Sequence, residues 1–243
     1  MNFKYHQPVP DCYDKDNPDE PLTEISDKDF KKFKKLAKKY GVNEMVYSKL
    51  SDEFKKEWDI DFDNVITLVY LFPDEILKMD PSKEKATLLD DEFQDVGGYI
   101  YKITDFLRDS GYKADIINPL DDRISLRAIA MQSNDCAILR SNMCLFKGGL
   151  ATGFFQISTS IENLPFKDEN DMLWVKDYCN DCGKCIKKCP HDAYDEDEKV
   201  IKKVCLAHKE GCSICMIKCP FYKKGYEKIK EKYIKKMKKR LKK

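Results

Sequence analysis

The sequence predicts an α+β protein in which an α/β domain is followed by a small cysteine-rich module and a basic C-terminal helix. Three observations predict this order. Helical and strand patterns alternate up to about residue 165, eight of the eleven cysteines fall between residues 179 and 219, and basic residues crowd into the last part of the chain. Alternating helices and strands are typical of a layered domain around one apolar core.

The α/β domain is expected at residues 27–170, after an irregular segment at 1–26 that is rich in proline and aspartate. Ser26 and Asp29 fit a capping box at the start of a first amphipathic helix. Residues 65–70 are apolar and β-branched, so they are predicted to form a buried strand.

The second half of this domain repeats the alternation. Apolar residues recur at helical spacing over 91–110, which predicts a second amphipathic helix. Shorter patterns predict a strand at 114–117, a helix at 123–131, and two strands at 135–145 and 153–160.

The net charge of +1 hides a strong asymmetry, because residues 223–243 carry a net charge of +10 and the rest about −9. We expect residues 223–243 to form a lysine-rich helix whose apolar face packs on the body of the protein, with the lysines in water. The alternative is that this helix binds RNA through phosphate contacts.

The composition also bears on location and redox chemistry. No run approaches the roughly 18–20 apolar residues that span a bilayer, and the first residues lack the apolar core of a signal peptide. We therefore expect a cytoplasmic protein. Eleven cysteines in such a protein indicate metal or redox chemistry rather than disulfides.

Eight cysteines within a module at 171–222 follow two related patterns. The first, C-x2-C-x2-C-x3-C-P, runs from Cys179 to Pro190, and the second runs from Cys205 to Pro220 with a wider first gap. The first pattern is used by bacterial ferredoxins, in which the fourth cysteine binds the other cluster. A zinc site usually has two C-x2-C pairs separated by a longer loop and does not explain this run. The module is therefore predicted to bind two 4Fe–4S clusters.

Crossing the fourth cysteine of each pattern gives each cluster four ligands. Cluster 1 would take Cys179, Cys182, Cys185 and Cys219, and cluster 2 would take Cys189, Cys205, Cys212 and Cys215. The remaining cysteines are Cys12, Cys136 and Cys144, and a lone cysteine is most often a small buried hydrophobe. His191 and His208 lie in the module but are not needed as ligands.

Some 165 residues precede the module, far more than a ferredoxin needs. The order of features resembles that of epoxyqueuosine reductases and corrinoid reductive dehalogenases, in which a nitroreductase-like domain holds cobalamin and precedes a double-cluster module. The similarity is strongest at 179–220, where the wide gap between Cys205 and Cys212 separates the chain from ordinary ferredoxins. Weaker similarity extends over most of 27–222, for example in LRDSGYKA at 107–114.

The resemblance implies a reductase that takes electrons from a low-potential donor such as ferredoxin or flavodoxin. The electrons would pass through both clusters to a cofactor or substrate in the upstream domain. The resemblance also implies cobalamin as the cofactor, a small molecule or tRNA as the substrate, and an aspartate as the catalytic proton donor. Asp115 is the nearest candidate by spacing, followed by Asp121 and Asp122. A solvated loop carboxylate is the alternative for each of them.

One stretch departs from the family pattern. Corrinoid-using members have a glycine-rich stretch where the backbone approaches the corrin, whereas residues 128–136 (AIAMQSNDC) contain no glycine. Glycine permits close approach and backbone angles that bulkier residues do not. Two alternatives therefore stay open: a reductase, and a non-catalytic electron-transfer or accessory protein whose corrinoid site has been lost.

Overall fold

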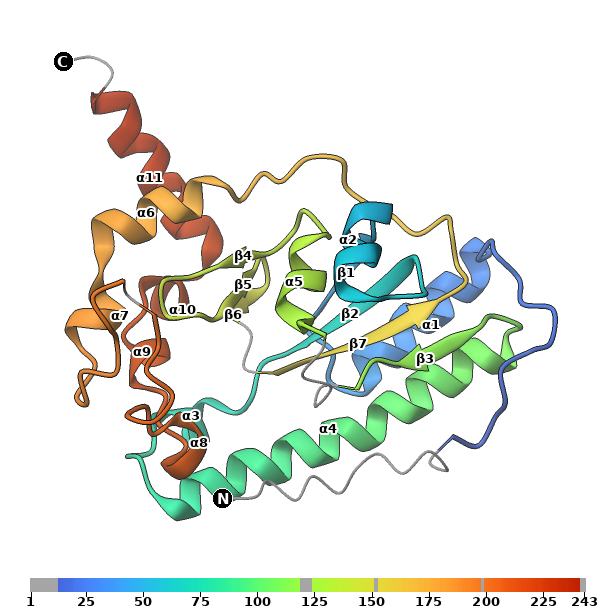
Figure 1. The fold of residues 1–243 in the computed structure, drawn as a ribbon, viewed down its shortest axis with the longest axis horizontal. Helices are drawn as coiled ribbons and strands as arrows, with labels where there is room; N and C mark the ends of the chain where they lie inside the picture. The colour runs from blue at the N-terminus through green and yellow to red at the C-terminus, as the bar shows by residue number, and fades with distance from the viewer. Residues whose placement is uncertain (1–12, 119–123, 151–152, 198, 241–243) are drawn as a thin grey trace. The chain divides into compact units, whose positions relative to one another are not determined.

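Figure 1 shows the fold of the protein in a computed structural model, which describes residues 13–118, 124–150, 153–197 and 199–240. Contacts divide the chain into two compact units. The unit called here the sheet unit comprises Met1–Tyr70, Asp90–Asp135 and Thr152–Asn170, and the cysteine unit comprises Leu71–Leu89, Cys136–Ala151 and Asp171–Lys243.

The two units alternate along the sequence. The cysteine unit takes in the cysteine-rich module and the basic helix, together with 71–89 and 136–151. Composition alone had placed both of these earlier segments in the first domain. The finer division into four consecutive parts, at 1–26, 27–170, 171–222 and 223–243, stays a prediction.

An antiparallel sheet of four strands, in the order β1-β2-β7-β3, forms the centre of the sheet unit. The strands are β1 (Glu44–Lys49), β2 (Asn64–Tyr70), β3 (Ala114–Ile116) and β7 (Gly153–Thr159). The register of the two central strands sets Ile66 opposite Ile157 and Leu68 opposite Phe155. Helices combined with an antiparallel sheet confirm the predicted mixed fold.

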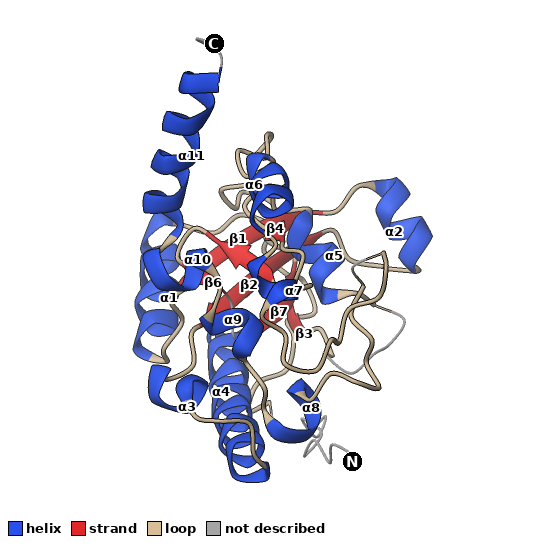
Figure 2. Ribbon diagram, turned by 90° about the vertical axis from the view of Figure 1, so that its left-hand side faces the viewer, coloured by secondary structure: helices blue, strands red, loops and turns tan. Residues whose placement is uncertain are grey.

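Helices cover both faces of this sheet, as the strands between helices in Figure 2 show. On one face, Phe93 of α4 (Lys83–Asp109) stacks on Phe155, with ring centroids 4.7 Å apart. On the other face, Ile129 of α5 (Leu126–Met131) packs with Val65 of β2 in one apolar cluster. Because both faces are covered, all seven residues of β2 are buried.

Two further helices complete the sheet unit. Helix α1 (Asp27–Lys39) begins at the predicted capping residue, because the Asp29 amide donates to the Ser26 hydroxyl at 3.1 Å. Its Phe33 stacks on Phe106 of α4. Helix α2 (Asp52–Trp58) is capped in the same way by Ser51. The sequence did not predict α2 or strand β1.

Several predicted boundaries are wrong. Helix α4 begins at Lys83 rather than at residue 91, because Ser82 caps it by accepting from the Lys85 amide at 3.1 Å. The predicted strand at 135–145 is two short strands, β4 (Ala137–Ile138) and β5 (Cys144–Phe146). A turn at Asn142, with φ of +61°, separates them.

The cysteine unit has a three-stranded sheet, β4-β5-β6, with β6 at Gly149–Leu150. Its short helices are α3 (Asp74–Lys78), α6 (Trp174–Cys182), α7 (Lys184–Lys187), α8 (Ala207–Glu210), α9 (Ile214–Ile217) and α10 (Pro220–Lys224). The basic helix, α11 (Tyr226–Arg240), begins later than predicted because Gly225, with φ of +76°, separates it from α10. Across the described ranges, no helix is long and apolar enough to cross a membrane.

Candidate metal centre

Four of the eight module cysteines line one cavity in the cysteine unit. They are Cys179, Cys182, Cys185 and Cys219. The first three lie on α6 and α7, and Cys219 immediately precedes α10, near the end of the second pattern. The structure therefore places one cysteine of the second pattern in the same cavity as three cysteines of the first pattern.

The turn between α6 and α7 aims this first group inward. Gly183 ends α6 in the left-handed conformation, with φ of +56°, and its amide donates to the Cys179 carbonyl at 3.1 Å. Arg140 also donates to this carbonyl, at 3.1 Å, and to that of Asn180, at 3.2 Å. These contacts satisfy carbonyl groups that the end of a helix leaves unpaired.

The environment of this first group disfavours free thiolates. Burial raises the pKa of Cys179 to about 12, although the backbone amide of Arg140 acts in the opposite direction. The neighbouring thiols of Cys219, Cys185 and Cys182 raise the pKa further. Thiols that are buried this close together gain most from bound cations, because a metal removes the penalty of holding several negative charges.

Backbone amides also point at the sulfur of Cys219. The amides of Phe221 and Tyr222 donate to it and lower its pKa, although burial raises that pKa overall. Both amides lie in the first turn of α10, where they have no partner within the helix. Hydrogen bonds of this kind to cluster ligands help to set a reduction potential.

A second group contains Cys205, Cys212 and Cys215. Burial raises the pKa of Cys215 to about 11, and the nearby Cys212 and Cys205 add to the shift. Its sulfur also accepts a hydrogen bond from the Tyr194 hydroxyl. The sulfur of Cys189 accepts from the amide of Ala193, the residue before this tyrosine, at 3.5 Å.

The two groups meet at α7 and α9, which carry Cys185 and Cys215 and pack on each other. Cys185 acts electrostatically on Cys215 as well as on Cys179. A four-iron cluster binds one thiolate at each of four iron atoms. The four cysteines that line one cavity match this donor set.

Aromatic side chains pack beside the first group. Trp174 contacts Tyr178, Phe221 and Tyr233, at ring-centroid distances of 6.2, 5.9 and 5.0 Å. Its indole nitrogen donates to the Tyr226 hydroxyl at 3.3 Å. This packing places apolar rings next to Cys179 and Cys219, and solvent exclusion influences the potential of a cluster.

The remaining cysteines and histidines have simpler surroundings. Cys136 and Cys144 are buried in the cysteine unit, outside the cavity lined by Cys179. His191 is half-buried in a turn. Cys12 and the side chain of His208 lie outside the described part of the protein.

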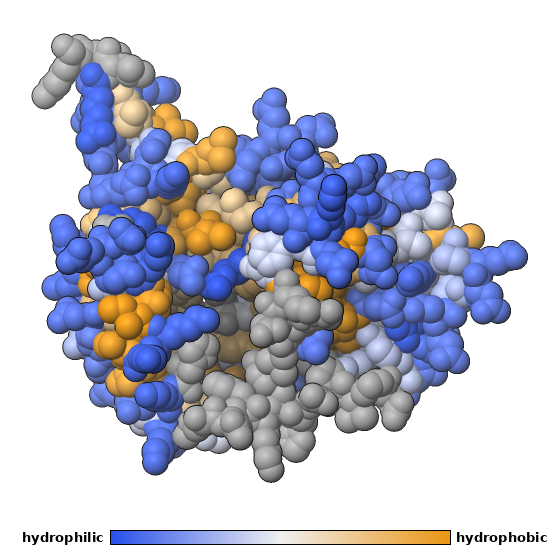
Figure 3. All heavy atoms as spheres, in the orientation of Figure 1, coloured by the Kyte–Doolittle hydropathy of each residue, from blue (hydrophilic) through white to orange (hydrophobic). Residues whose placement is uncertain are grey.

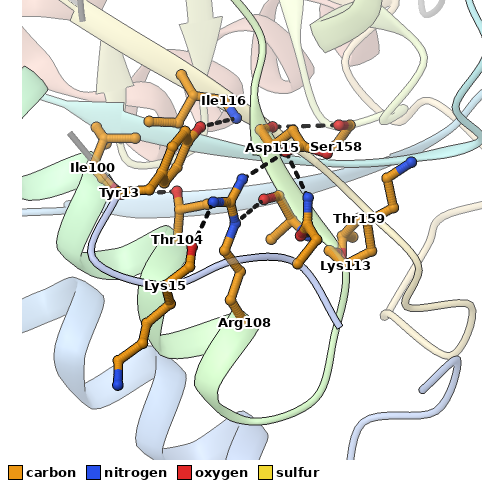
Figure 4. A network of polar contacts seen from close by, with 12 residues as sticks. Tyr13, Lys15, Ile100, Thr104, Arg108, Lys113, Asp115, Ile116, Ser158 and Thr159 are labelled. Atoms are coloured by element: carbon orange, nitrogen blue, oxygen red, sulfur yellow. Dashed lines mark hydrogen bonds and ion pairs between the residues drawn. The ribbon is translucent and has the colours of Figure 1, made fainter. Parts of the chain in front are cut away.

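Asp115 lies on β3 in the sheet unit, within a polar network (Figure 4). Arg108 of α4 donates to its carboxylate at 2.6 Å, and the Asn17 amide donates to it at 2.8 Å. The Arg108 side chain is only 6% exposed, and its guanidinium lies 3.6 Å from the centroid of the Tyr13 ring. Asp115 thus helps to tie residues 13–17 to the end of α4.

Asp115 also borders a cavity of about 440 Å³ in the sheet unit. Asp61, Lys113 and Ser158 line it too. Its volume falls in the range of about 300–1,000 Å³ that is usual for small-molecule sites. The catalytic role of Asp115 stays a prediction, and Asp121 and Asp122 lie outside the described residues.

The glycine-free stretch does not form an open backbone surface. Residues 126–131 are helix α5, and Ile129 and Ala130 are fully buried. Ile129 packs with Leu50 and Val65 in the core of the sheet unit. The stretch is thus a regular helix without glycine, and it lacks the bare backbone that the resemblance implies at a corrin contact.

Comparison with known proteins identifies the class of the cysteine unit. Residues 172–194 match the family described as "4Fe-4S binding domain". This match includes Cys179, Cys182, Cys185 and Cys189. No curated protein matches the chain by sequence. The protein is therefore an iron–sulfur protein of mixed helix and sheet fold.

Solved structures give the fold more closely. The chain is similar to a catabolic reductive dehalogenase, with 13% identity and a TM-score of 0.62 over 78% of this chain and 31% of that one. A second reductive dehalogenase, connected with B12-dependent dehalogenation, gives 16% identity and a TM-score of 0.64 over 83% and 34%. Epoxyqueuosine reductase from Bacillus subtilis gives 12% identity and a TM-score of 0.50 over 81% and 66%.

The chain thus spans about a third of the length of these two dehalogenases. Its fold is similar to part of the fold of reductive dehalogenases and epoxyqueuosine reductases, so the resemblance drawn from the sequence is confirmed at the level of the fold.

Proposed function

We propose that the protein is a reductase that passes low-potential electrons through two 4Fe–4S clusters to an acceptor bound by its upstream, nitroreductase-like part. The observation that carries this proposal is the position of Cys219. It belongs to the second cysteine pattern and lies in one cavity with Cys179, Cys182 and Cys185. Crossed ligands of this kind are typical of two-cluster ferredoxins, which carry electrons.

The proposed ligands follow from the two groups of cysteines. Cluster 1 is held by Cys179, Cys182, Cys185 and Cys219, and cluster 2 by Cys189, Cys205, Cys212 and Cys215. Iron supplies the one-electron chemistry in each cluster. The chain supplies eight thiolates, and amides such as those of Phe221 and Tyr222 donate to the sulfur of Cys219.

Serine variants test the crossing on the anaerobically reconstituted full chain. Cys179→Ser and Cys219→Ser should alter the same electron paramagnetic resonance (EPR) signal, and Cys212→Ser should alter the other. Each should lower the iron content from about eight to about four atoms per chain. Cys144→Ala, which changes a buried cysteine outside the cavity, is the control. A Cys219 variant that alters the signal lost in the Cys212 variant would refute the crossing.

The electron donor is proposed to be an acidic redox protein such as ferredoxin or flavodoxin, docked on basic side chains near cluster 1. Asp181, between two cluster 1 cysteines, pairs with Lys236 at 2.7 Å and Arg240 at 3.3 Å on α11. Figure 3 shows hydrophilic side chains along one side of α11, with apolar ones beside them. One hollow along this helix is lined by Lys232, Lys235, Lys236, Lys239 and Arg240. Repulsion from Lys232 also lowers the pKa of Lys224.

Electrostatic docking predicts that the rate of reduction by flavodoxin falls steeply with added salt. Lys232→Glu with Lys235→Glu should slow reduction in the same way and leave reduction by dithionite unchanged. Salt-independent reduction by flavodoxin would exclude this docking surface. If the same variant still docks flavodoxin but no longer binds tRNA, the result would instead support the RNA alternative.

The acceptor is proposed to bind in the cavity of the sheet unit, with Asp115 as the proton donor. The volume of this cavity suits a small molecule or a single modified base rather than a macromolecule. Asp115→Asn should abolish turnover of halogenated or epoxide-containing acceptors and leave the iron content unchanged. Full turnover by this variant would remove Asp115 from the mechanism.

The second candidate function is a non-catalytic electron-transfer or accessory protein, and the buried, glycine-free α5 favours it. Anaerobic titration of the full chain with hydroxocobalamin, and separately with flavin mononucleotide, distinguishes the two functions. A spectral shift that saturates at one equivalent supports an enzyme that uses that cofactor. No shift with either compound, and no turnover of added acceptors, supports the accessory role.

A further inference from the structure

Lys85 is a buried lysine in the first turn of α4, within the cysteine unit. Only 1% of its surface is exposed. Lysine is almost never fully buried unless it is paired, because its long stem normally carries the charge to water. Its burial therefore needs a specific explanation.

The hydrogen bonds of Lys85 match the charged form of its side chain. Its ammonium nitrogen donates to the Leu77 carbonyl at 2.8 Å, the Met79 carbonyl at 2.7 Å and the Ser213 hydroxyl at 2.8 Å. An ammonium group has three N–H donors, and these three acceptors use all of them. A neutral amine has only two N–H donors. The Leu77 carbonyl also accepts from the Ser213 hydroxyl.

The three acceptors are neutral, so they solvate the charge without balancing it. No carboxylate in the described ranges forms an ion pair with Lys85, and the nearest acid that acts on it, Asp80, is exposed. Burial lowers the pKa of Lys85, and Cys212 and Asp80 act in the opposite direction.

Cys212 lies close to Lys85. It raises the pKa of the lysine more than Asp80 does. A Cβ atom on Gly211 would lie 3.0 Å from Lys85 Cγ, so the lysine stem packs directly against the loop that carries Cys212. The neighbouring Ser213 accepts the ammonium hydrogen bond. The lysine thus lies next to the loop that carries a proposed ligand of cluster 2.

We propose that Lys85 is the buried countercharge of cluster 2 and raises the reduction potential of that cluster. This inference rests on the proposed pair of clusters. A cluster with four thiolate ligands is anionic, and it gains a further negative charge when it accepts one electron from the donor, which loses that electron. A fixed positive charge in a poorly solvated position stabilises the reduced form more than the oxidised form.

An anaerobic redox titration of the reconstituted full chain, followed by EPR, tests this role. In Lys85→Gln, the equilibrium constant for reduction of cluster 2 should fall about tenfold, which is about 59 mV for a one-electron couple. The affected signal should be the one that Cys212→Ser removes. The potential of cluster 1 should not change. Lys85→Arg keeps the charge and should keep both potentials near those of the unchanged protein.

Ser213→Ala separates charge from packing, because it removes one acceptor and leaves the ammonium in place. We expect it to lower thermal stability and leave both potentials unchanged. Equal potentials in the Gln variant and the unchanged protein would overturn the proposal. If Lys85→Gln loses iron, the proposal requires that Lys85→Arg retains iron. Loss of iron in both variants would show that Lys85 has a packing role only.

The failure of the underlying function has a different signature. If the protein without substitutions holds about four iron atoms and gives a single cluster signal, the proposal of cluster 2 itself is refuted. If the protein gives two cluster signals and neither responds to Lys85→Gln, only the proposed role of Lys85 is refuted.

Discussion

The sheet unit is built around buried strands, and all seven residues of β2 lie between helices on both faces. The cysteine unit is built from short helices instead, and α7 and α9 have four residues each. A four-residue helix is far too short to be stable alone. The first unit folds by burying apolar side chains. The second collects thiols that repel one another as thiolates, so we expect its stability to depend on the bound metal.

Removal of iron should therefore affect the two units very differently, and this is the largest effect we expect. Chelation after oxidation of the clusters should unfold the cysteine unit over residues 171–224 and leave the sheet unit folded. Hydrogen exchange measured by mass spectrometry should show lost protection at 171–224 and retained protection at 64–70 and 153–159. Equal loss in both units, or in neither, would contradict this dependence on metal.

Truncating a buried side chain of the four-stranded sheet should destabilise the sheet unit and leave the iron of the cysteine unit in place. Ile66 is fully buried opposite Ile157, and Ile66→Ala should lower the free energy of unfolding by about 2–5 kcal/mol. The iron content should stay unchanged. Leu22→Ala, at a side chain that is 53% exposed, is the control and should change stability by less than about 0.5 kcal/mol. Urea unfolding followed by circular dichroism measures both variants.

Gly211→Ala should act on the cysteine unit by distorting the loop that holds Cys212. Gly211 has φ of +63°, and a Cβ there would lie 3.0 Å from Lys85 Cγ and 3.1 Å from the Ala86 amide nitrogen. We expect a loss of about 1–3 kcal/mol and less iron in cluster 2.

Gly97→Ala is the matched control, because Gly97 lies in α4 and a Cβ there has open space around it. The control should be neutral or stabilising by up to about 1 kcal/mol. Thermal unfolding and iron content measure the pair. Equal destabilisation by the two substitutions would show that the loop around Cys212 is not specifically constrained.

Arg108→Leu should have the smallest effect of the four. It removes hydrogen bonds to Asp115 and to the Ala114 and Lys15 carbonyls, together with the contact on Tyr13. Because Asp115 is 42% exposed, water replaces part of what is lost, and we expect about 1–2 kcal/mol. Lys15→Ala, which breaks an exposed ion pair with Asp109, should have almost no effect in the same urea experiment.

The sequence predicted elements well where one local signal dominates. The Ser26 cap, the apolar run of β2 and the cysteine spacing each act over a few residues, and the structure contains α1, β2 and a cavity lined by four cysteines. The start of α4 was missed because its first two turns carry no apolar periodicity. Its Ser82 cap was the available signal.

Features that depend on distant partners could not be predicted from local patterns. Nothing in the sequence around Lys85 shows that it is buried, since its acceptors include Ser213, 128 residues away. Arg140 is likewise an ordinary residue of a turn until the fold brings it to the carbonyl of Cys179. Both residues contribute to the candidate site through tertiary contacts alone.

The central claim is that the eight module cysteines hold two clusters. Iron and acid-labile sulfide counts on the anaerobically reconstituted full chain, together with Mössbauer spectra, test it most directly. We predict about eight iron atoms and eight sulfides per chain, in the spectral form of 4Fe–4S clusters. About four of each, or zinc in place of iron, would contradict the claim.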